Sequence, residues 1–338
     1  MGAQAAVGFH WTLQYLLVSL VCAHPVGHLA SGLSSAEARA VSVLQRRLRL
    51  TDRELQRTLV AHPAVLGYSF ETNIAPKLDA LARRVALSEA ELKKVVLLNP
   101  FLLGLSYEAN IEPTLTRLEM ELELAPAELR KVLVAQPQVL GLSVESNILP
   151  TLEGLATRLR LEAAELRRLV VRTPQLLTMS MASNVLPTLD TIQARLELSD
   201  EQLRRLVISL PQVLGLSLES NVLPKLDYLQ RELGFSTDEL REQVLREPTV
   251  LGGSLTSSIQ PNLELWRREL PDTDLKTEIS RRGLRFLCCS FARRTEPRME
   301  LARQCSVPSD MLLGRMRLTD AQFDAWLARQ QATASGGL

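Results

Sequence analysis

The stretch Gly104-Leu-Ser106-Tyr-Glu-Ala-Asn110-Ile-Glu-Pro113 decides the fold, because its pattern returns along the chain every 37 residues. The same spacing of glycine, serine, asparagine and proline ends again at Pro76, at Pro150 and at Pro224. Two series of prolines hold the interval over six successive units: Pro63, Pro100, Pro137, Pro174, Pro211 and Pro248, and then Pro76, Pro113, Pro150, Pro187, Pro224 and Pro261. Self-similarity at such a period is typical of a repeat protein in which each unit is one supersecondary element.

Each unit is predicted to begin with a helix that opens on a capping box. In Ser88-Glu-Ala-Glu91 the serine covers free backbone N–H groups, and the glutamate reaches back to the serine N–H. Leu92, Val95 and Val96 follow with the i, i+3, i+4 spacing of one buried helix face. The box recurs as Thr51 with Glu54, Ser199 with Gln202 and Ser236 with Glu239, while Pro126 starts its helix as a proline in the first turn.

The second helix of each unit is expected to begin at the asparagine. Asn110 would then be the N-cap, and Pro113 would lie in the first turn, where a missing N–H costs little. The linker between Pro100 and Ser106 has room for a 3₁₀ turn but not for a strand, and no segment alternates with period two. The predicted fold class is therefore all-α, an α-solenoid of helix–helix–3₁₀ repeats with about seven units plus terminal caps.

The ends of the array are predicted to be incomplete or diverged units. Residues 36–50 align one period upstream of residues 73–87, so the array opens with a lone second helix. A diverged last unit has Leu284 at the first proline position and Pro297 at the second. A final helix opens at Leu318 and is expected to end at about Gln330. We assign 1–33 to a targeting or disordered segment, 34–330 to the repeat domain and 331–338 to a disordered tail.

The N-terminal segment has a composition of its own, since the first charged residue is Glu37. Trp11 to Ala23 is a mostly apolar run that resembles the hydrophobic part of a signal peptide and is short for a membrane span. The basic residues that usually precede such a run are absent, and so is the arginine-rich amphipathic pattern of a simple mitochondrial presequence. We interpret the segment as targeting sequence, with a disordered or misassigned start as the alternative.

Composition favours helices and gives no sign of catalysis. Hydrophobic residues make up 46% of the chain but aromatic residues only 4%, so leucine, a strong helix former, builds the core. The four cysteines form no CxxC pair, and we interpret the loose spacing of Cys22, His24 and His28 as chance rather than a metal site. There is no phosphate-binding G-x-x-x-x-G-K loop and no Ser/His/Asp set, so we expect no enzymatic activity, no cofactor and no metal.

The net charge is only +1, so a nucleic-acid interface has to come from the distribution of charge. The two positions that directly follow the first leucine of each first helix are unusually basic, with Gln56 and Glu242 as exceptions, and they lie away from the buried stripe. Stacked units would align them into a basic ladder that could follow a phosphate backbone. The alternative is an ordinary solvated helix face. The candidate residues are Arg57, Lys93, Lys94, Arg130, Lys131, Arg167, Arg168, Arg204 and Arg205.

A second basic group lies near the C-terminus, where Glu296 is the only acidic residue between 281 and 298. Arginine suits phosphate because its planar guanidinium donates two parallel hydrogen bonds. Residues 64–248, by contrast, have a net charge of −5, which argues for weaker binding than a strongly basic protein would show. The candidate residues of this C-terminal cluster are Arg281, Arg282, Arg285, Arg293, Arg294 and Arg298.

The repeat resembles that of the mitochondrial transcription termination factor (mTERF) family. The resemblance rests on the Pro-x-x-Leu-x-x-Ser and Asn-Ile-x-Pro-x-Leu elements, and on the closing segments Glu296–Glu300 and Leu318–Phe323. It covers roughly residues 40 to 330. It implies a curved helical array in mitochondria or plastids that binds nucleic acid along a basic groove, without a catalytic centre. It also implies a role in transcription termination or initiation, intron splicing or ribosome assembly.

These observations predict a non-catalytic, monomeric, organellar nucleic-acid-binding protein that has no membrane association in its mature form. Duplex DNA is the favoured partner, bound to regulate or terminate transcription, with organellar transcription or ribosome proteins as further partners. One alternative is an RNA-binding factor in splicing or ribosome assembly. The other is a helical scaffold that binds protein, which the near-neutral charge favours. The motifs do not separate DNA from RNA.

Overall fold

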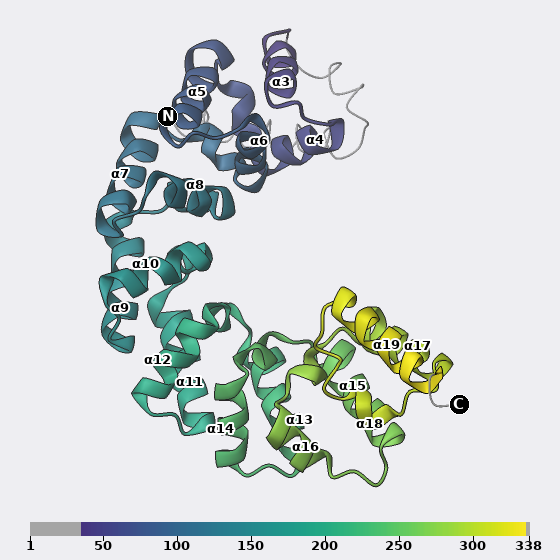
Figure 1. The fold of residues 1–338 in the computed structure, drawn as a ribbon. Helices are drawn as coiled ribbons and strands as arrows, with labels where there is room; N and C mark the ends of the chain where they lie inside the picture. Colours follow the sequence, from purple (N-terminus) through teal and green to yellow (C-terminus); the bar gives the residue numbers. More distant parts are fainter. Residues whose placement is uncertain (1–34, 336–338) are drawn as a thin grey trace, which may run out of the picture. The chain divides into compact units, whose positions relative to one another are not determined.

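The computed structural model describes residues 35–335, and within that range the chain forms helices, turns and no strand. The helices come in repeated pairs, which confirms the predicted all-α solenoid repeat (Figure 1). The chain divides into two compact units between Ser180 and Met181, and each is described by itself. The predicted targeting segment 1–33 lies outside the described residues. No helix in the described part is long and apolar enough to cross a bilayer.

One repeat shows how the elements arise. Its first helix is α6 (Glu89–Leu98), which the predicted capping box starts: the Ser88 N–H donates to Glu91 Oε2 at 2.9 Å, and the Glu91 N–H donates to Ser88 Oγ at 3.3 Å. A 3₁₀ turn η3 (Pro100–Gly104) follows, as the short linker predicted. A π-turn η4 (Tyr107–Ile111) then leads into the second helix, α7 (Glu112–Glu121).

The start of the second helix corrects the sequence prediction. Ser106 is the N-cap, because its Oγ accepts a hydrogen bond from the Ala109 N–H at 3.1 Å. Asn110 instead lies inside the π-turn, and its Oδ1 accepts from the Ser106 N–H at 3.1 Å. The wider turn precedes Pro113, whose ring would crowd the carbonyl four residues back in a regular helix. Helical backbone therefore begins before the asparagine.

In unit 1 the first helices form one row and the second helices another, with α6, α8 and α10 packed in succession (Figure 1). Leu92, Leu103 and Leu115 are fully buried between the rows. The lone opening helix α3 is present as predicted. The elements besides the repeat above are α3 (Ser35–Leu48), α4 (Asp52–Ala61), η1 (Pro63–Gly67), η2 (Phe70–Ile74), α5 (Ala75–Arg84), α8 (Pro126–Ala135), η5 (Pro137–Gly141), η6 (Val144–Ile148), α9 (Leu149–Leu159), α10 (Ala163–Arg172) and η7 (Pro174–Thr178).

Unit 2 continues the repeat and then departs from it. Its regular elements are η8 (Met181–Val185), α11 (Leu186–Leu196), α12 (Asp200–Ser209), η9 (Pro211–Gly215), η10 (Leu218–Val222), α13 (Leu223–Leu233), α14 (Thr237–Arg246), η11 (Pro248–Gly252), η12 (Leu255–Ile259) and α15 (Gln260–Glu269). The diverged unit comprises α16 (Leu275–Arg282), η13 (Arg285–Cys288), η14 (Phe291–Thr295) and α17 (Glu296–Gln304).

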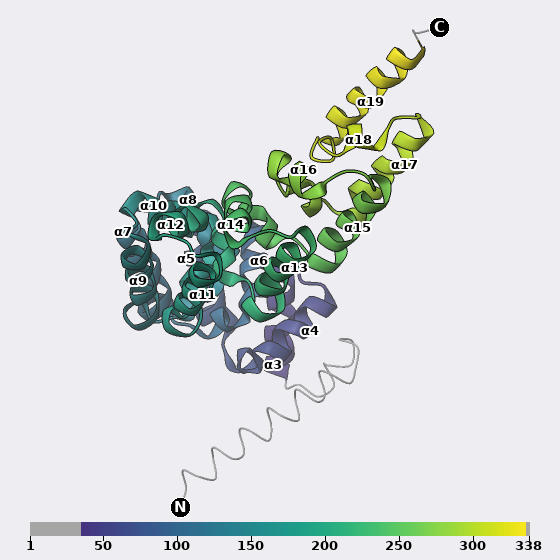
Figure 2. The ribbon, with the colours of Figure 1, turned by 90° about the horizontal axis from the view of Figure 1, so that it is seen from below.

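The chain closes with α18 (Ser309–Leu312) and α19 (Asp320–Ser335), and Figures 1 and 2 both show α17 beside these two helices. The last helix extends to Ser335, beyond the predicted end at about Gln330. Residues 331–335 are therefore helical rather than part of a disordered tail. The Gln331 side chain donates to Cys305 Sγ at 2.9 Å, a contact that the sequence pattern did not indicate.

A buried polar residue follows the second proline of the repeats, and in five of them it bonds a carbonyl further along the chain; the sequence analysis missed this role. Lys77 Nζ donates to the Leu103 carbonyl at 2.6 Å, and Thr151 Oγ1 donates to the Met179 carbonyl at 3.1 Å. Lys225, Asn262 and Arg298 occupy the same position in later repeats and also donate to carbonyls further along the chain. Buried carbonyls need hydrogen-bond donors, so these side chains fix neighbouring repeats against each other. We call the residue at this position the latch residue.

Candidate nucleic-acid interface

The first position of the basic ladder binds the capping box of the preceding repeat. Lys93 Nζ lies 2.7 Å from Glu54 Oε2, and this hydrogen bond holds the pKa of Glu54 at about 2. The hydrogen bond from Arg130 likewise lowers the pKa of Glu91 to about 2. Two such pairs repeat with a 2.5 Å separation, Arg130 with Glu91 and Arg167 with Glu128. These three cations are therefore held in ion pairs between repeats.

In unit 2 the cations at the first ladder position are also held by neighbouring groups. Arg204 lies 3.6 Å from Glu201 of its own helix, and Lys276 lies 2.9 Å from Glu239 of the preceding repeat. Arg241 binds Asp238 and also reaches the carbonyl of Glu197 at 3.4 Å. First-position cations thus belong mainly to the scaffold in both units.

The second ladder position is the exposed one. Arg57, Lys94, Lys131 and Arg168 of unit 1 and Arg205 of unit 2 are all exposed. Arg205 lies 3.7 Å from Glu201, a long contact between two exposed side chains, which contributes little. Between α4 and α6 a groove of about 470 Å³ is lined by Arg57 and Lys94, with Lys93 beside them. The structure therefore divides the predicted ladder into a paired row and an exposed row.

The C-terminal cluster is also divided. Arg281 and Arg282, at the end of α16, both donate to Glu278, and hydrogen bonds from Arg282 and then Arg281 lower the pKa of that carboxyl. Arg285 and Arg293 are exposed, and neither has an ion pair within residues 35–335. Arg294 is half-buried, and its side chain lies beside the thiol of Cys289.

Arg298 does not belong to the exposed cluster. Its side chain is buried, with an exposed fraction of 4%. It donates to the Met316 carbonyl at 3.1 Å and to Asp320 Oδ1 at 2.6 Å, and its guanidinium lies 4.5 Å from the centre of the Phe323 ring. The sequence prediction counted Arg298 with its basic neighbours, but the fold uses it as the latch residue of the last repeat.

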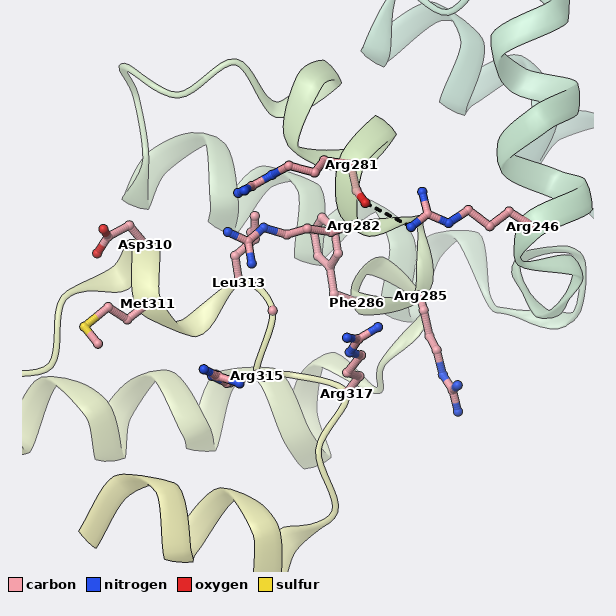
Figure 3. Close-up of a pocket in the computed structure, with 11 residues that line it drawn as sticks. Arg246, Arg281, Arg282, Arg285, Phe286, Asp310, Met311, Leu313, Arg315 and Arg317 are labelled. Atoms are coloured by element: carbon pink, nitrogen blue, oxygen red, sulfur yellow. Dashed lines mark hydrogen bonds between the residues drawn. The ribbon is translucent and has the colours of Figure 1, made fainter. Parts of the chain in front are cut away.

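Part of the cluster lines a pocket of about 510 Å³ in unit 2 (Figure 3). The pocket brings Arg281, Arg282 and Arg285 together with three arginines that the sequence analysis did not select: Arg246, Arg315 and Arg317. Arg246 donates to the carbonyls of Ser280 and Arg281 at 2.9 Å, the second of which Figure 3 marks with a dashed line. Asp310 is the only acidic residue of the described chain that lines the pocket.

A family model supplies the identity of the repeat. The mTERF model matches residues 28–158 and residues 154–300, which together span most of the chain. The chain belongs to the mTERF family. This confirms the resemblance seen in the repeat, and mTERF proteins are organellar helical-repeat proteins that bind nucleic acid. No curated protein matches the chain significantly.

Only some of the pocket arginines lie within the residues that the mTERF model matches. Arg246, Arg281, Arg282 and Arg285 lie inside the matched residues, whereas Arg315 and Arg317 lie beyond residue 300. Arg246 and Arg282 occupy corresponding positions of adjacent repeats, so the repeat alignment could have found Arg246. Arg315 and Arg317 stand in the loop between α18 and α19, which has no counterpart in the repeats and gave no such signal.

A buried carboxyl supports the backbone of the arginine pocket in this mTERF protein. Burial raises the pKa of Glu247, and its side chain accepts a hydrogen bond from the Arg285 backbone. Gly283 allows this approach: its φ is +86°, and a Cβ there would lie 2.5 Å from Glu247 Oε1. Any side chain at position 283 would both strain the backbone and displace the carboxyl.

Proposed function

We propose that this mTERF protein binds double-stranded DNA without catalysing a reaction, and thereby regulates or terminates transcription in mitochondria or plastids. The observation that carries the proposal is the set of exposed basic side chains at the second ladder position and near the C-terminus. In unit 1 these are Arg57, Lys94, Lys131 and Arg168; in unit 2 they are Arg205, whose contact with Glu201 is long, and Arg285, Arg293, Arg315 and Arg317. Exposed cations of this kind release counterions when they contact phosphates, which is the main source of affinity for duplex DNA.

The net charge of −5 over residues 64–248 opposes DNA binding less than its value suggests. Glu54, Glu91 and Glu128 each lie in an ion pair with a first-position cation of the next repeat. These carboxylates are therefore neutralised locally, and the exposed second-position cations lie on the same helices as the pairs. Because salt screens charges beyond about 10 Å at 0.1 M, the local arrangement matters more than the sum over the chain.

The test is a titration of the whole protein against duplex DNA and against structured RNA at several salt concentrations. Lys94→Ala/Lys131→Ala is compared with Lys93→Ala/Arg130→Ala. Both variants lose two positive charges from α6 and α8, so the long-range electrostatic change is matched and the difference reports direct phosphate contact. We expect the first variant to lower the salt slope by about 2, and the second to lower it less.

Four results would contradict the proposal or one of its parts. Absence of duplex binding at low salt, or binding that does not depend on salt, would remove the electrostatic basis of the interface. Equal slopes for the two variants would refute the division into a paired and an exposed row. Tighter binding of RNA than of DNA would move the protein to the alternative function in splicing or ribosome assembly.

A further inference from the structure

The arginine pocket differs from the exposed ladder because it is a recess. It lies between the end of α16 and the chain segment that leads from α18 to α19 (Figure 3). Its volume of about 510 Å³ falls within the range of small-ligand sites. Besides the arginines it is lined by Phe286, Met311, Leu313 and Gly314, and by one acid, Asp310. A recess of this composition combines strong positive charge with an apolar wall.

The six arginines of the pocket make different contacts. Arg246 holds the last carbonyls of α16, and Arg281 and Arg282 share Glu278. The guanidinium groups of Arg285, Arg315 and Arg317 make no hydrogen bond to a carboxylate within residues 35–335, although Glu247 lies near Arg285 and Arg317. Arg315 lies 5.8 Å from the centre of the Trp326 ring, and the buried Arg298 binds the carbonyls of Arg315 and Met316. The segment that presents Arg315 and Arg317 is thus anchored, although neither guanidinium group is held in an ion pair within the described residues.

The shape of the recess favours a terminal phosphate over the phosphodiesters of a duplex. A duplex presents singly charged phosphodiesters on a convex surface, which suits an exposed row of cations rather than a recess. A terminal phosphate protrudes, carries about −1.5 to −2 charges at neutral pH and offers three acceptor oxygens. Its nucleoside could cover Met311, whose side chain is 43% exposed at the rim. Arginine forks match these acceptors with paired hydrogen bonds.

We propose that this pocket binds a terminal phosphate group, presented by the 5′ end of a nucleic-acid strand or by a free nucleotide. For the strand end the inference rests on the proposed nucleic-acid binding. Arg315 and Arg317 contact the phosphate, and the exposed Met311 faces the nucleoside. Arg281 and Arg282 remain bound to Glu278 and supply the surrounding positive potential.

The experiment measures binding of the full chain to a short duplex with 5′-phosphate ends and to the same duplex with 5′-hydroxyl ends. A parallel arm measures binding of adenosine triphosphate. For the wild type we expect about a tenfold preference for the phosphorylated duplex, or nucleotide binding, since one added charge-assisted hydrogen bond has that effect or more. In Arg315→Ala/Arg317→Ala we expect the preference ratio to fall to about one and nucleotide binding to be lost.

The matched control is Arg205→Ala/Arg293→Ala, which removes two exposed arginines of the same unit outside the pocket. It should weaken binding of both duplexes by the same factor and keep their ratio. Circular dichroism and a denaturant midpoint show whether each variant is folded. Equal affinity for both duplexes together with no nucleotide binding would overturn the pocket assignment. If the pocket proposal fails in this way, salt-dependent binding of both duplexes would still support the proposed function. Absence of any duplex binding would contradict the proposed function too.

Discussion

At the scale of single residues, Arg298 shows how burial changes the role of a basic side chain. It bridges α17 to the Met316 carbonyl and to Asp320, and its guanidinium lies over Phe323. We predict that Arg298→Ala lowers the free energy of unfolding by about 2 kcal/mol, because the Met316 carbonyl loses its buried partner. Urea denaturation measures this. Arg293→Ala, an exposed control, should change it by less than about 0.5 kcal/mol. Equal effects of the two changes would show that Arg298 is not a structural latch.

Lys225, the corresponding residue in an earlier repeat, should make stability depend on pH. Its side chain is 1% exposed and donates to the carbonyls of Leu251 and Gly253, and burial lowers the pKa of this lysine from 10.5 to about 8. Between these two pH values the unfolded chain holds a proton that the folded chain has released. Folding is therefore favoured increasingly as the pH rises through that window.

The comparison with Lys225→Met isolates this effect from other titrating groups. We expect the free energy of unfolding of the wild type to rise relative to that of the variant between pH 8 and pH 10.5, the window set by the two pKa values. Urea unfolding at several pH values within the window is the measurement. Cys288 lies nearby, and burial raises the pKa of its thiol from 9.0 to about 12, so it also makes stability depend on pH. Both proteins contain this thiol, so its contribution cancels to first order in the comparison. A difference that stays constant with pH would contradict the prediction.

At the scale of one element, the capping boxes explain where first helices begin and suggest how to stabilise one. Glu128 accepts a hydrogen bond from the Ala125 N–H at 2.9 Å, but Ala125 has no side-chain oxygen to return the bond. We predict that Ala125→Ser completes the box and raises the free energy of unfolding by about 1 kcal/mol. Thermal or urea unfolding tests this, with Ser88→Ala as the reverse change and an expected loss of about the same size. A loss of stability in Ala125→Ser would show that Pro126 already determines this helix start.

At the scale of the whole molecule, the division of the cations predicts how binding should respond to salt. Lys94, Lys131 and Arg168 are exposed and have no ion pair within the described chain, so each should contribute close to a full phosphate contact. We predict that their replacement by alanine lowers the slope of log Kd against log salt concentration by about 3. Arg130→Ala/Arg167→Ala/Arg204→Ala, which removes three first-position cations, should change this slope less and the denaturant midpoint more. The reverse ranking would show that paired cations open to bind phosphate.

The sequence by itself determined the repeat, the all-α class, the capping boxes and the location of the basic ladder. These features depend on residues within one turn or one helix, where spacing and propensity act directly, as Ser88 and Glu91 illustrate. Only the tertiary structure decided which cations are available. Lys93 is bound by a glutamate 39 residues away, Arg298 is buried under α19, and Arg315 meets Arg282 in one pocket. Pairing and burial are set by what packs against a side chain, and that partner lies in another repeat or outside the repeats altogether.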